Sequence, residues 1–302
     1  MIRDTLVAAI FLYCDEIGWT KLWFTADSII LITGVLANTA LLWLFIKERK
    51  QVSASQVLGV NIVLMDLIYL CVMPLGLVMD ANPQREQNGS NREFSASEWE
   101  KSNSTDTLQV TRNVFSMFNL IGCPLLLSCM CIERYVAVLK PVLYLKVRKR
   151  EYRMAISAVV WVITLSFCIA TATMEEKIYM MLPVSLTISC LFILMLACLC
   201  GVIWSLLQQS PAHTCSESPQ KKRAVHNVLV VVVPAVVSYL PVLAMVPLVI
   251  YIQYNNKLLG LDLCYVVKLT ALFPRLGVFI GPLFFLSKAR QLCCIDSFIS
   301  KH

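Results

Sequence analysis

The chain has 302 residues, of which 58% are hydrophobic and 15% charged, and its formal net charge is +7. Soluble domains are about 45–50% apolar and about 25% charged, so this composition, with a mean hydropathy of +0.71, excludes a soluble globule, a disordered chain and a nucleic-acid-binding domain. Lipid must cover part of the apolar surface, and the composition therefore predicts a membrane protein.

Long apolar segments follow one another along the chain. A helix that crosses the hydrocarbon core needs about 20 mostly apolar residues. Seven segments meet this condition, at roughly 24–46, 56–79, 110–138, 155–173, 179–207, 225–252 and 265–286. The predicted fold class is an all-α membrane protein, a seven-transmembrane helix bundle over 24–286. Residues 1–23 form a tail before the bundle, expected to be retained rather than cleaved as a signal sequence, and 287–302 form a short tail after it.

The loops alternate in charge. Basic residues outnumber acidic ones in four segments: 47–50, 139–154, 208–223 and the tail after 286. Because basic loops stay cytoplasmic, the N-terminus is predicted outside and the C-terminus inside, and the net charge needs no nucleic acid as partner. Two glycosylation sequons, at Asn88 and Asn103, fall in the long loop that the charges place outside.

Polar and proline residues recur at fixed places inside the apolar segments. They are Asn38 in the first, Asn61 and Asp66 in the second, Glu133-Arg134-Tyr135 at the end of the third, Trp161 in the fourth, Tyr239 and Pro241 in the sixth, and Pro282 in the seventh. This order resembles the rhodopsin-like (class A) G-protein-coupled receptors from about 24 to 294. Within that family the chain is loosely similar to the branch that holds nucleotide, lipid and protease-activated receptors.

The resemblance implies a plasma-membrane receptor that acts through a heterotrimeric G protein. In such a receptor Arg134, flanked by Glu133 and Tyr135, is released from Glu133 to contact the G protein. The alternative is an ordinary ion pair at a helix end. Some relatives hold this arginine with an acid at the start of span six, where basic residues 221–223 stand here, so we expect a bias toward the open state and basal coupling.

Asp66 lies near the centre of the second segment. A carboxylate is expensive at this depth, so it should face the bundle interior, with Asn38 and Asn119 as candidate partners. The resemblance implies a sodium ion at Asp66, but Gly277 and Gly281 stand where span seven usually supplies asparagines, and this site is incomplete. The alternative is a neutral Asp66 hydrogen-bonded to Asn38. No other cofactor is expected.

The last two segments carry the predicted moving parts. Pro241 should kink span six, and the resemblance implies that this helix swings outward on activation. Tyr239 stands in place of the usual tryptophan, and Phe285, after Pro282, in place of a tyrosine. These departures keep open an alternative function, a non-signalling receptor-like protein that acts as a decoy, scavenger or modulator of a partner.

The cysteines indicate no zinc site but offer candidates for a disulfide bond and for palmitoylation. Most of the 13 cysteines lie within apolar runs, and no spacing typical of zinc sites occurs. The family's usual disulfide cannot form because Gln109 occupies the matching position; a Cys14–Cys264 bond, as some relatives have, is the alternative to two free thiols. Cys293 and Cys294 are candidates for palmitoylation, or else unmodified.

Three basic residues lie toward the outer ends of spans. Lys268 and Arg275 are seven residues apart and so share a helix face, and Arg112 lies on span three. A guanidinium as deep as Arg275 should line a cavity or meet an acid. We expect these residues to receive an anionic ligand, such as a nucleotide, carboxylate or lysolipid headgroup. The alternative is an internal pair of Arg275 with Asp66 or Asp27.

The sequence thus favours a receptor over the other classes of membrane protein. A transporter or channel is a distant alternative, because no repeat relates the two halves. An enzyme is not expected, because the three histidines lie at or near the predicted cytoplasmic side and no hydrolase motif occurs.

Overall fold

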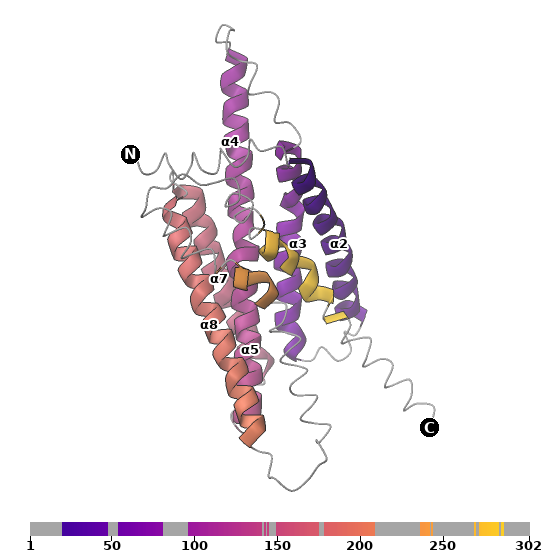
Figure 1. Cartoon of the computed structure of the whole chain (residues 1–302), viewed down its shortest axis with the longest axis vertical. Helices are drawn as coiled ribbons and strands as arrows, with labels where there is room; N and C mark the ends of the chain where they lie inside the picture. Colours follow the sequence, from indigo (N-terminus) through magenta and orange to yellow (C-terminus); the bar gives the residue numbers. More distant parts are fainter. Residues whose placement is uncertain are drawn as a thin grey trace, which may run out of the picture.

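The computed structural model describes residues 20–47, 54–80, 96–140, 142, 144, 149–174, 178–208, 236–241, 243, 269, 272–283, 285 and 286. Its helices are α2 (Thr20–Lys47), α3 (Ala54–Asp80), α4 (Ala96–Met117), the π-helical turn η3 (Phe118–Gly122), α5 (Cys123–Leu139), α7 (Arg150–Thr173) and α8 (Ile178–Gln208). They form an elongated bundle in which α4, η3 and α5 follow one another as one long rod (Figure 1).

Five stretches of the described helices are long and apolar enough to cross a bilayer. They are Trp23–Lys47, Val57–Leu77, Thr107–Leu139, Arg150–Thr173 and Pro183–Ser205, and each coincides with one of the first five predicted spans. The predicted seventh span contains a shorter apolar helix, Leu272–Leu283, and the sixth is described at 236–241 and 243. The chain is an all-α membrane protein, as predicted.

The start of the third span differs from the prediction. The apolar run predicted a helix from about residue 110, whereas α4 begins at Ala96 and extends past the neighbouring helices at one end of the bundle (Figure 1). Once a helix is nucleated, each further residue adds a hydrogen bond at little cost. A membrane-anchored helix can therefore continue through polar sequence, here for roughly 20 Å beyond the predicted start at 1.5 Å per residue.

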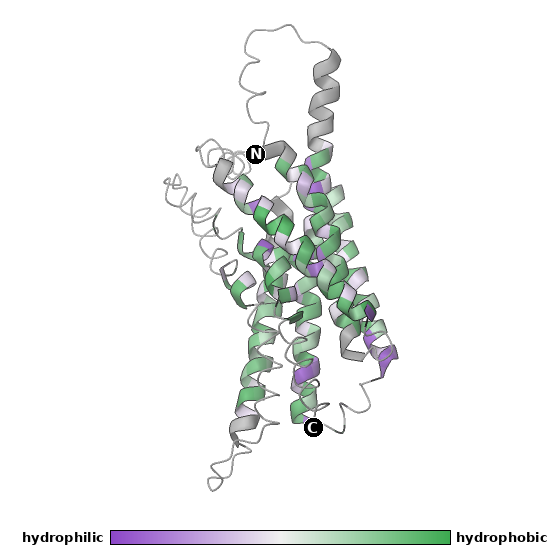
Figure 2. Ribbon diagram, turned by 90° about the vertical axis from the view of Figure 1, so that its right-hand side faces the viewer, coloured by the Kyte–Doolittle hydropathy of each residue, from purple (hydrophilic) through white to green (hydrophobic). Residues whose placement is uncertain are grey.

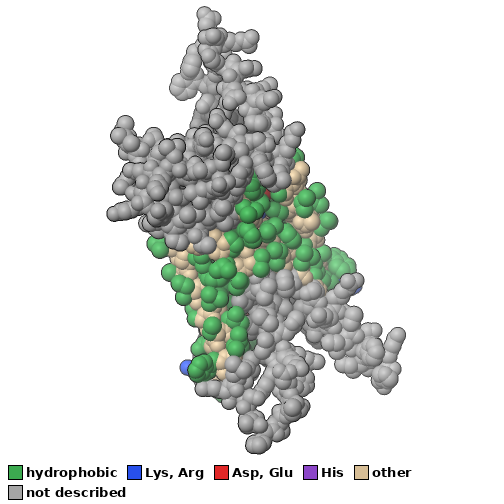
Figure 3. Space-filling model, viewed as in Figure 1, with side chains coloured by type: hydrophobic (Ala, Val, Ile, Leu, Met, Phe, Trp, Pro, Cys, Tyr) green, Lys and Arg blue, Asp and Glu red, His purple; other side chains and the backbone are tan. Residues whose placement is uncertain are grey.

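Helix α7 shows how the side chains are distributed around the bundle. Its buried positions recur every three or four residues and include the polar residues Ser157 and Thr164, while Val162 and Ile169 are each 64% exposed. A water-soluble helix would show the reverse pattern. Hydrophobic residues accordingly predominate along the described helices (Figure 2). The face seen in Figure 3 is apolar around the middle of the bundle, as expected of helices that face lipid.

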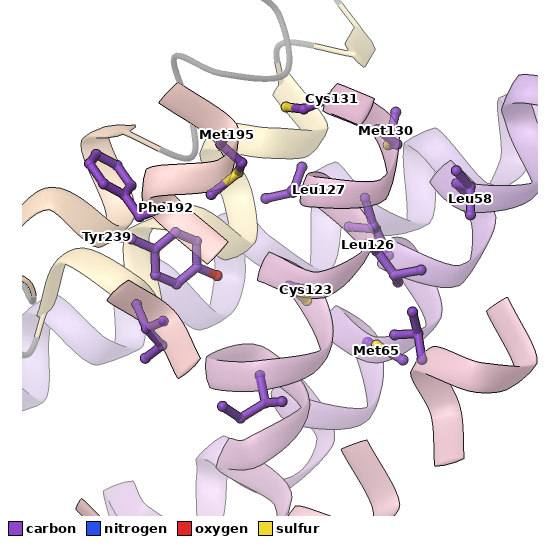
Figure 4. Close-up of a cluster of buried hydrophobic side chains, with 14 of the residues drawn as sticks. Leu58, Met65, Cys123, Leu126, Leu127, Met130, Cys131, Phe192, Met195 and Tyr239 are labelled. Carbon is purple, nitrogen blue, oxygen red and sulfur yellow. The ribbon is translucent and has the colours of Figure 1, made fainter. Parts of the chain in front are cut away.

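The main core surrounds α5, which packs chiefly against α8. Leu126 of α5 and Met195 of α8 are almost fully buried there, together with Met65 of α3 (Figure 4). Tyr239, from the described part of the sixth span, enters the same cluster with its hydroxyl directed toward the rod of the third span (Figure 4). With Val160 and Cys168 of α7, this cluster joins α3, α5, α7, α8 and the described part of the sixth span.

Polar side chains tie α3 to α7. The indole nitrogen of Trp161 donates to Oδ1 of Asn61 at 2.8 Å, and the Asn61 amide donates to Ser157 Oγ at 3.2 Å. The two residues that carried the family resemblance in spans two and four are therefore direct partners. The interaction fixes the rotation of α7 so that its polar stripe faces inward.

Gly201 allows α5 and α8 to approach closely. A Cβ atom at this position would lie 3.1 Å from Cδ2 of Tyr135 and closer still to Cε2. Because the tyrosine ring lies directly over the glycine, any side chain on α8 at this point would displace it. Gly281, in the seventh span, has no heavy atom of the described residues within 4 Å of the corresponding point.

We expect Gly201→Ala to lower the thermal unfolding temperature of the purified protein, because overpacking at a close helix contact costs about 1–3 kcal/mol. Gly281→Ala is the matched control and should raise it slightly, since alanine is favoured over glycine in a helix by about 1 kcal/mol. Equal stability of Gly201→Ala and the parent protein would contradict the contact between Tyr135 and Gly201.

Candidate functional site

Polar side chains interrupt the apolar interior at three depths. At the end where α4 begins lies an ion pair between Asp27 and Arg275. Halfway along the bundle lies a central polar group, which consists of Asn38, Asp66, Asn119, Cys123 and Tyr239. At the opposite end, where α5 ends and α7 begins, Glu133, Tyr144 and Arg153 form the Glu133 group.

The Asp27–Arg275 pair connects α2 to the seventh span. Arg275 Nη1 lies 2.5 Å from Asp27 Oδ2, and the Asp27 side chain is only 8% exposed, against 26% for Arg275. Of the alternatives left open by the sequence, the internal pair with Asp27 is therefore formed. The second carboxylate oxygen of Asp27 is buried and has no partner among the described residues.

Arg112 lies at the same end of the bundle, against α3. A Cβ atom at Gly76 would lie 3.0 Å from its Nε, so the glycine makes room for the guanidinium stem. Tyr69 of α3 is within electrostatic range of Arg275, Asp27 and Arg112. Two of the three predicted ligand-binding cations thus act on the same tyrosine, and the third, Lys268, lies outside the described residues.

We expect Asp27→Asn and Arg275→Met each to lower the unfolding temperature. Arg275→Met has the larger effect, because it leaves the buried Asp27 carboxylate without this counter-charge, at a cost on the order of 3 kcal/mol. The double variant should be destabilised by less than the two single effects combined, since it leaves no unpaired charge. Thermal unfolding of the four purified proteins measures this coupling, and strictly additive effects would contradict an ion pair.

The central polar group surrounds Asp66, which is 2% exposed. Its Oδ1 accepts a hydrogen bond from the Cys123 thiol at 3.2 Å, and the Asn119 side chain is a second hydrogen-bonding neighbour. Asn38 instead donates to the carbonyls of Gly34 at 3.0 Å and of Val278 at 2.8 Å. The alternative in which Asp66 is hydrogen-bonded to Asn38 is therefore not the arrangement formed.

The contacts around Asp66 can be compared with the needs of a sodium ion. Hard cations take several oxygen ligands, whereas the Cys123 group that donates to this carboxylate is a thiol. Among the described residues, no cluster of three or more histidine, cysteine, aspartate or glutamate side chains could hold a metal ion. A sodium ion at Asp66 therefore stays a prediction.

Pro124 explains the π-helical turn in the middle of the third span. A proline has no N–H and its ring clashes with the carbonyl four residues earlier, so a regular helix cannot pass through it undisturbed. The Cys123 N–H bonds to the Phe118 carbonyl, five residues back. In this register the donor for the Asn119 carbonyl would be the nitrogen of Pro124, which carries no hydrogen. The turn therefore leaves one buried carbonyl without a backbone partner.

Tyr239 satisfies this carbonyl. Its hydroxyl donates to the Asn119 carbonyl at 3.1 Å, and its side chain is 2% exposed. The next residue but one, Pro241, lies in the same described segment and is half-buried. The residue that replaces the family's usual tryptophan thus links the sixth span directly to the π-helical turn of the third.

We expect Tyr239→Phe to destabilise the protein by about 1 kcal/mol, because the Asn119 carbonyl would lose its hydrogen bond inside the bundle. In a Pro124→Ala background the same substitution should cost less, since alanine restores an N–H that can bond to the helix. Thermal unfolding of the two single variants and the double variant tests this dependence. An equal cost of Tyr239→Phe in both backgrounds would separate the hydroxyl from the π-helical turn.

The Glu133 group lies where α5 meets α7. Arg153 forms an ion pair with Glu133, and the two side chains are 4% and 12% exposed. The Tyr144 hydroxyl lies 3.4 Å from both Glu133 Oε1 and Arg153 Nη2. Glu133 is therefore paired with Arg153 of α7, whereas the neighbouring pair with Arg134 considered from the sequence is not formed.

The other predicted switch residues occupy separate positions. Arg134 is half-buried, and no ion pair or hydrogen bond of its side chain is found within the described part of the chain. Pro282 is buried in the seventh span, and Phe285 packs against the main core from its end. The third, sixth and seventh spans therefore meet in one cluster through Tyr239 and Phe285.

Three residues of these groups, and Pro124 beside them, were missed from the sequence. Pro124 is a proline within an apolar run, but a sequence does not separate a kink from a π-helical turn. Cys123 resembles any other apolar cysteine. Arg153 and Tyr144 lie in the basic segment 139–154, where the excess of charge was interpreted only as a sign of a cytoplasmic loop.

Several predicted modification sites cannot be placed. Cys14, Cys264, Asn88, Cys293 and Cys294 lie outside the described residues. Asn103 lies within the helical stretch of α4 that precedes the apolar span.

Comparison with known proteins finds several receptors that are similar to the chain. No family model matches the chain. Purinoceptor 1 of Gallus gallus is 23% identical over 240 residues, which covers 72% of this chain and 61% of that receptor. Lysophosphatidic acid receptor 4 of Mus musculus is 25% identical over 46% of the chain and 33% of its own length. Proteinase-activated receptor 3 of Rattus norvegicus is 23% identical over 51% of the chain and 38% of its own length.

These relatives are rhodopsin-like G-protein-coupled receptors rather than enzymes. They also come from the nucleotide, lipid and protease-activated branch, so the resemblance found in the sequence is confirmed. The chain spans 61% of the length of the first of these relatives.

Proposed function

We propose that this protein is a seven-helix receptor of the plasma membrane that transmits the binding of an extracellular ligand to an intracellular G protein. The alignment with the avian purinoceptor over 72% of the chain carries this proposal. The N-terminus, with a tail over 1–23, lies outside, and the tail over 287–302 lies inside. In this orientation the Asp27–Arg275 pair faces the extracellular end and the Glu133 group the cytoplasmic end.

An anionic ligand fits the extracellular end best. Arg112 lies in the space provided by Gly76, and Arg275 keeps a quarter of its side chain exposed while it binds Asp27. Lys268, seven residues before Arg275, shares its helix face by spacing. Two relatives are named for a purine and for lysophosphatidic acid, and guanidinium groups suit the phosphate that nucleotides and this lipid carry. Arg112 and Lys268 are the proposed contacts, with Arg275 supported by Asp27.

The mechanism is a shift between two packings of the same helices, without catalytic chemistry. The third and sixth spans are joined by the Tyr239–Asn119 hydrogen bond, beside Asp66 and its partners. A ligand that binds better when this contact is rearranged favours an outward position of the sixth span, which Pro241 allows to bend. Arg134 then becomes accessible to the G protein together with Tyr135.

We expect cells that express the full chain to show G-protein activation above an empty-vector control without added ligand. Arg134→Met should reduce this activation to the control level, because it removes the proposed contact with the G protein. An N-terminal epitope tag, read on unbroken cells, equalises surface expression and checks the orientation. Arg150→Met is the matched control, since Arg150 is exposed at the same end, and should leave activation unchanged.

The same cells test the ligand class with a panel of purine nucleotides and lysophospholipids. If one activates the receptor through its anionic group, Arg112→Gln should raise its half-maximal concentration about tenfold, equivalent to roughly 1.4 kcal/mol. Surface expression without activation of any G-protein subtype would favour the non-signalling receptor-like protein. Ligand-dependent ionic current would instead favour a channel or transporter.

A further inference from the structure

We propose that Arg153 is a positioning residue that holds Glu133 away from Arg134, so that loss of Arg153 transfers the carboxylate to Arg134 and withdraws that arginine from coupling. The inference rests on the proposed function for its signalling consequence, whereas the exchange of partners is a property of the helix bundle itself. It follows from the contacts of one acid with two arginines that lie on different helices.

Glu133 has its contacts across the helix interface. Arg153 belongs to the first turns of α7, and the two charged side chains are both largely buried. Tyr144 joins them from the segment between α5 and α7, where its backbone N–H bonds to the Lys140 carbonyl at 2.9 Å. The tyrosine hydroxyl donates to Glu133 and accepts from Arg153. The carboxylate is therefore engaged from two segments outside its own helix.

Because of the position of Arg153 at the start of α7, Glu133 and Arg153 stabilise each other's charge. A positive charge in the first turns of a helix is opposed by the helix dipole, whereas a negative charge near the same end is favoured. Glu133 supplies that negative charge to the start of α7 and also neutralises Arg153. Removal of either partner would leave the other buried without a counter-charge, which is costly.

Arg134 is the base closest to Glu133 along the chain. Adjacent residues on a helix do not face each other directly, so a pair of Arg134 with Glu133 is less favourable than the pair with Arg153, which meets Glu133 across the helix interface. When Arg153 is absent, the buried carboxylate needs a new partner, and the long Arg134 side chain can turn toward it. In the sequence, bases rather than an acid stand at 221–223, just before the predicted sixth span.

The test combines stability and signalling in the full-length receptor. In thermal unfolding, Glu133→Gln and Arg153→Met should be strongly non-additive, whereas Glu133→Gln and Arg134→Met should be additive. In an Arg153→Met background, Glu133→Gln and Arg134→Met should become non-additive, because the two residues now pair. Additivity in that background would overturn the proposal, as would an absence of coupling between Glu133 and Arg153.

In the signalling assay, Arg153→Met should reduce ligand-independent G-protein activation several-fold at equal surface expression. Glu133→Gln in the same chain should restore it, since a neutral glutamine does not hold Arg134. A merely structural role of Arg153 predicts no such rescue, and that result would overturn the proposal. Arg150→Met, one turn earlier on the same helix, serves as the control and should change neither readout.

Arg153→Lys, alone and combined with Glu133→Gln, separates a loss of folding from a loss of the exchange of partners. If Arg153→Met fails to reach the surface, Arg153→Lys retains the charge without the planar fork and should give an intermediate loss that Glu133→Gln again rescues. If the parent protein activates no G protein while the stability measurements show the exchange, the proposed function is wrong and the exchange of partners stands. If the parent protein signals and the exchange is absent, only the inference on Arg153 is wrong.

Discussion

The absence of water from the bilayer core determines how this bundle is held together. A backbone or side-chain polar group in that region has to find its partner inside the protein. The π-helical turn before Pro124 is the clearest case, because the proline leaves the Asn119 carbonyl without a backbone donor and the Tyr239 hydroxyl replaces it at 3.1 Å. A defect in one helix thereby creates a specific bond to another.

The same constraint accounts for two ion pairs between helices, in addition to side chains such as Thr164 that bond to a carbonyl of their own helix. Asp27 of α2 meets Arg275 of the short helix Leu272–Leu283, and Glu133 of α5 meets Arg153 of α7. The apolar surfaces between these contacts can pack against another helix or against lipid. The free energies of the two arrangements differ little, because lipid tails are as apolar as the side chains. A few polar contacts therefore set the relative position of the helices. At each of these contacts a ligand or a substitution can shift the packing.

The sequence predicted the helices well because apolar length is a direct requirement of the bilayer. The predicted span 179–207 agrees closely with α8, Ile178–Gln208, and the span 24–46 with α2, Thr20–Lys47. The start of α4 was missed because a helix outside the membrane needs no apolar residues. Partner choice could not be predicted either, since it depends on helix rotation: Arg134 is adjacent to Glu133 in sequence, yet Arg153 is the base that faces it.

The departures from the family pattern gain a physical explanation once the partners are known. Tyr239 in place of tryptophan suggested from the sequence that a switch residue had been lost. In the structure its hydroxyl is the donor for the Asn119 carbonyl, so the substitution adds a hydrogen bond that depends on Pro124 in another span. Ser238, beside it, lies 2.7 Å from the point where Gly277 would carry a Cβ, so the glycine permits the close approach of the sixth and seventh spans. Residues that look degenerate one at a time are thus matched to one another across the interface.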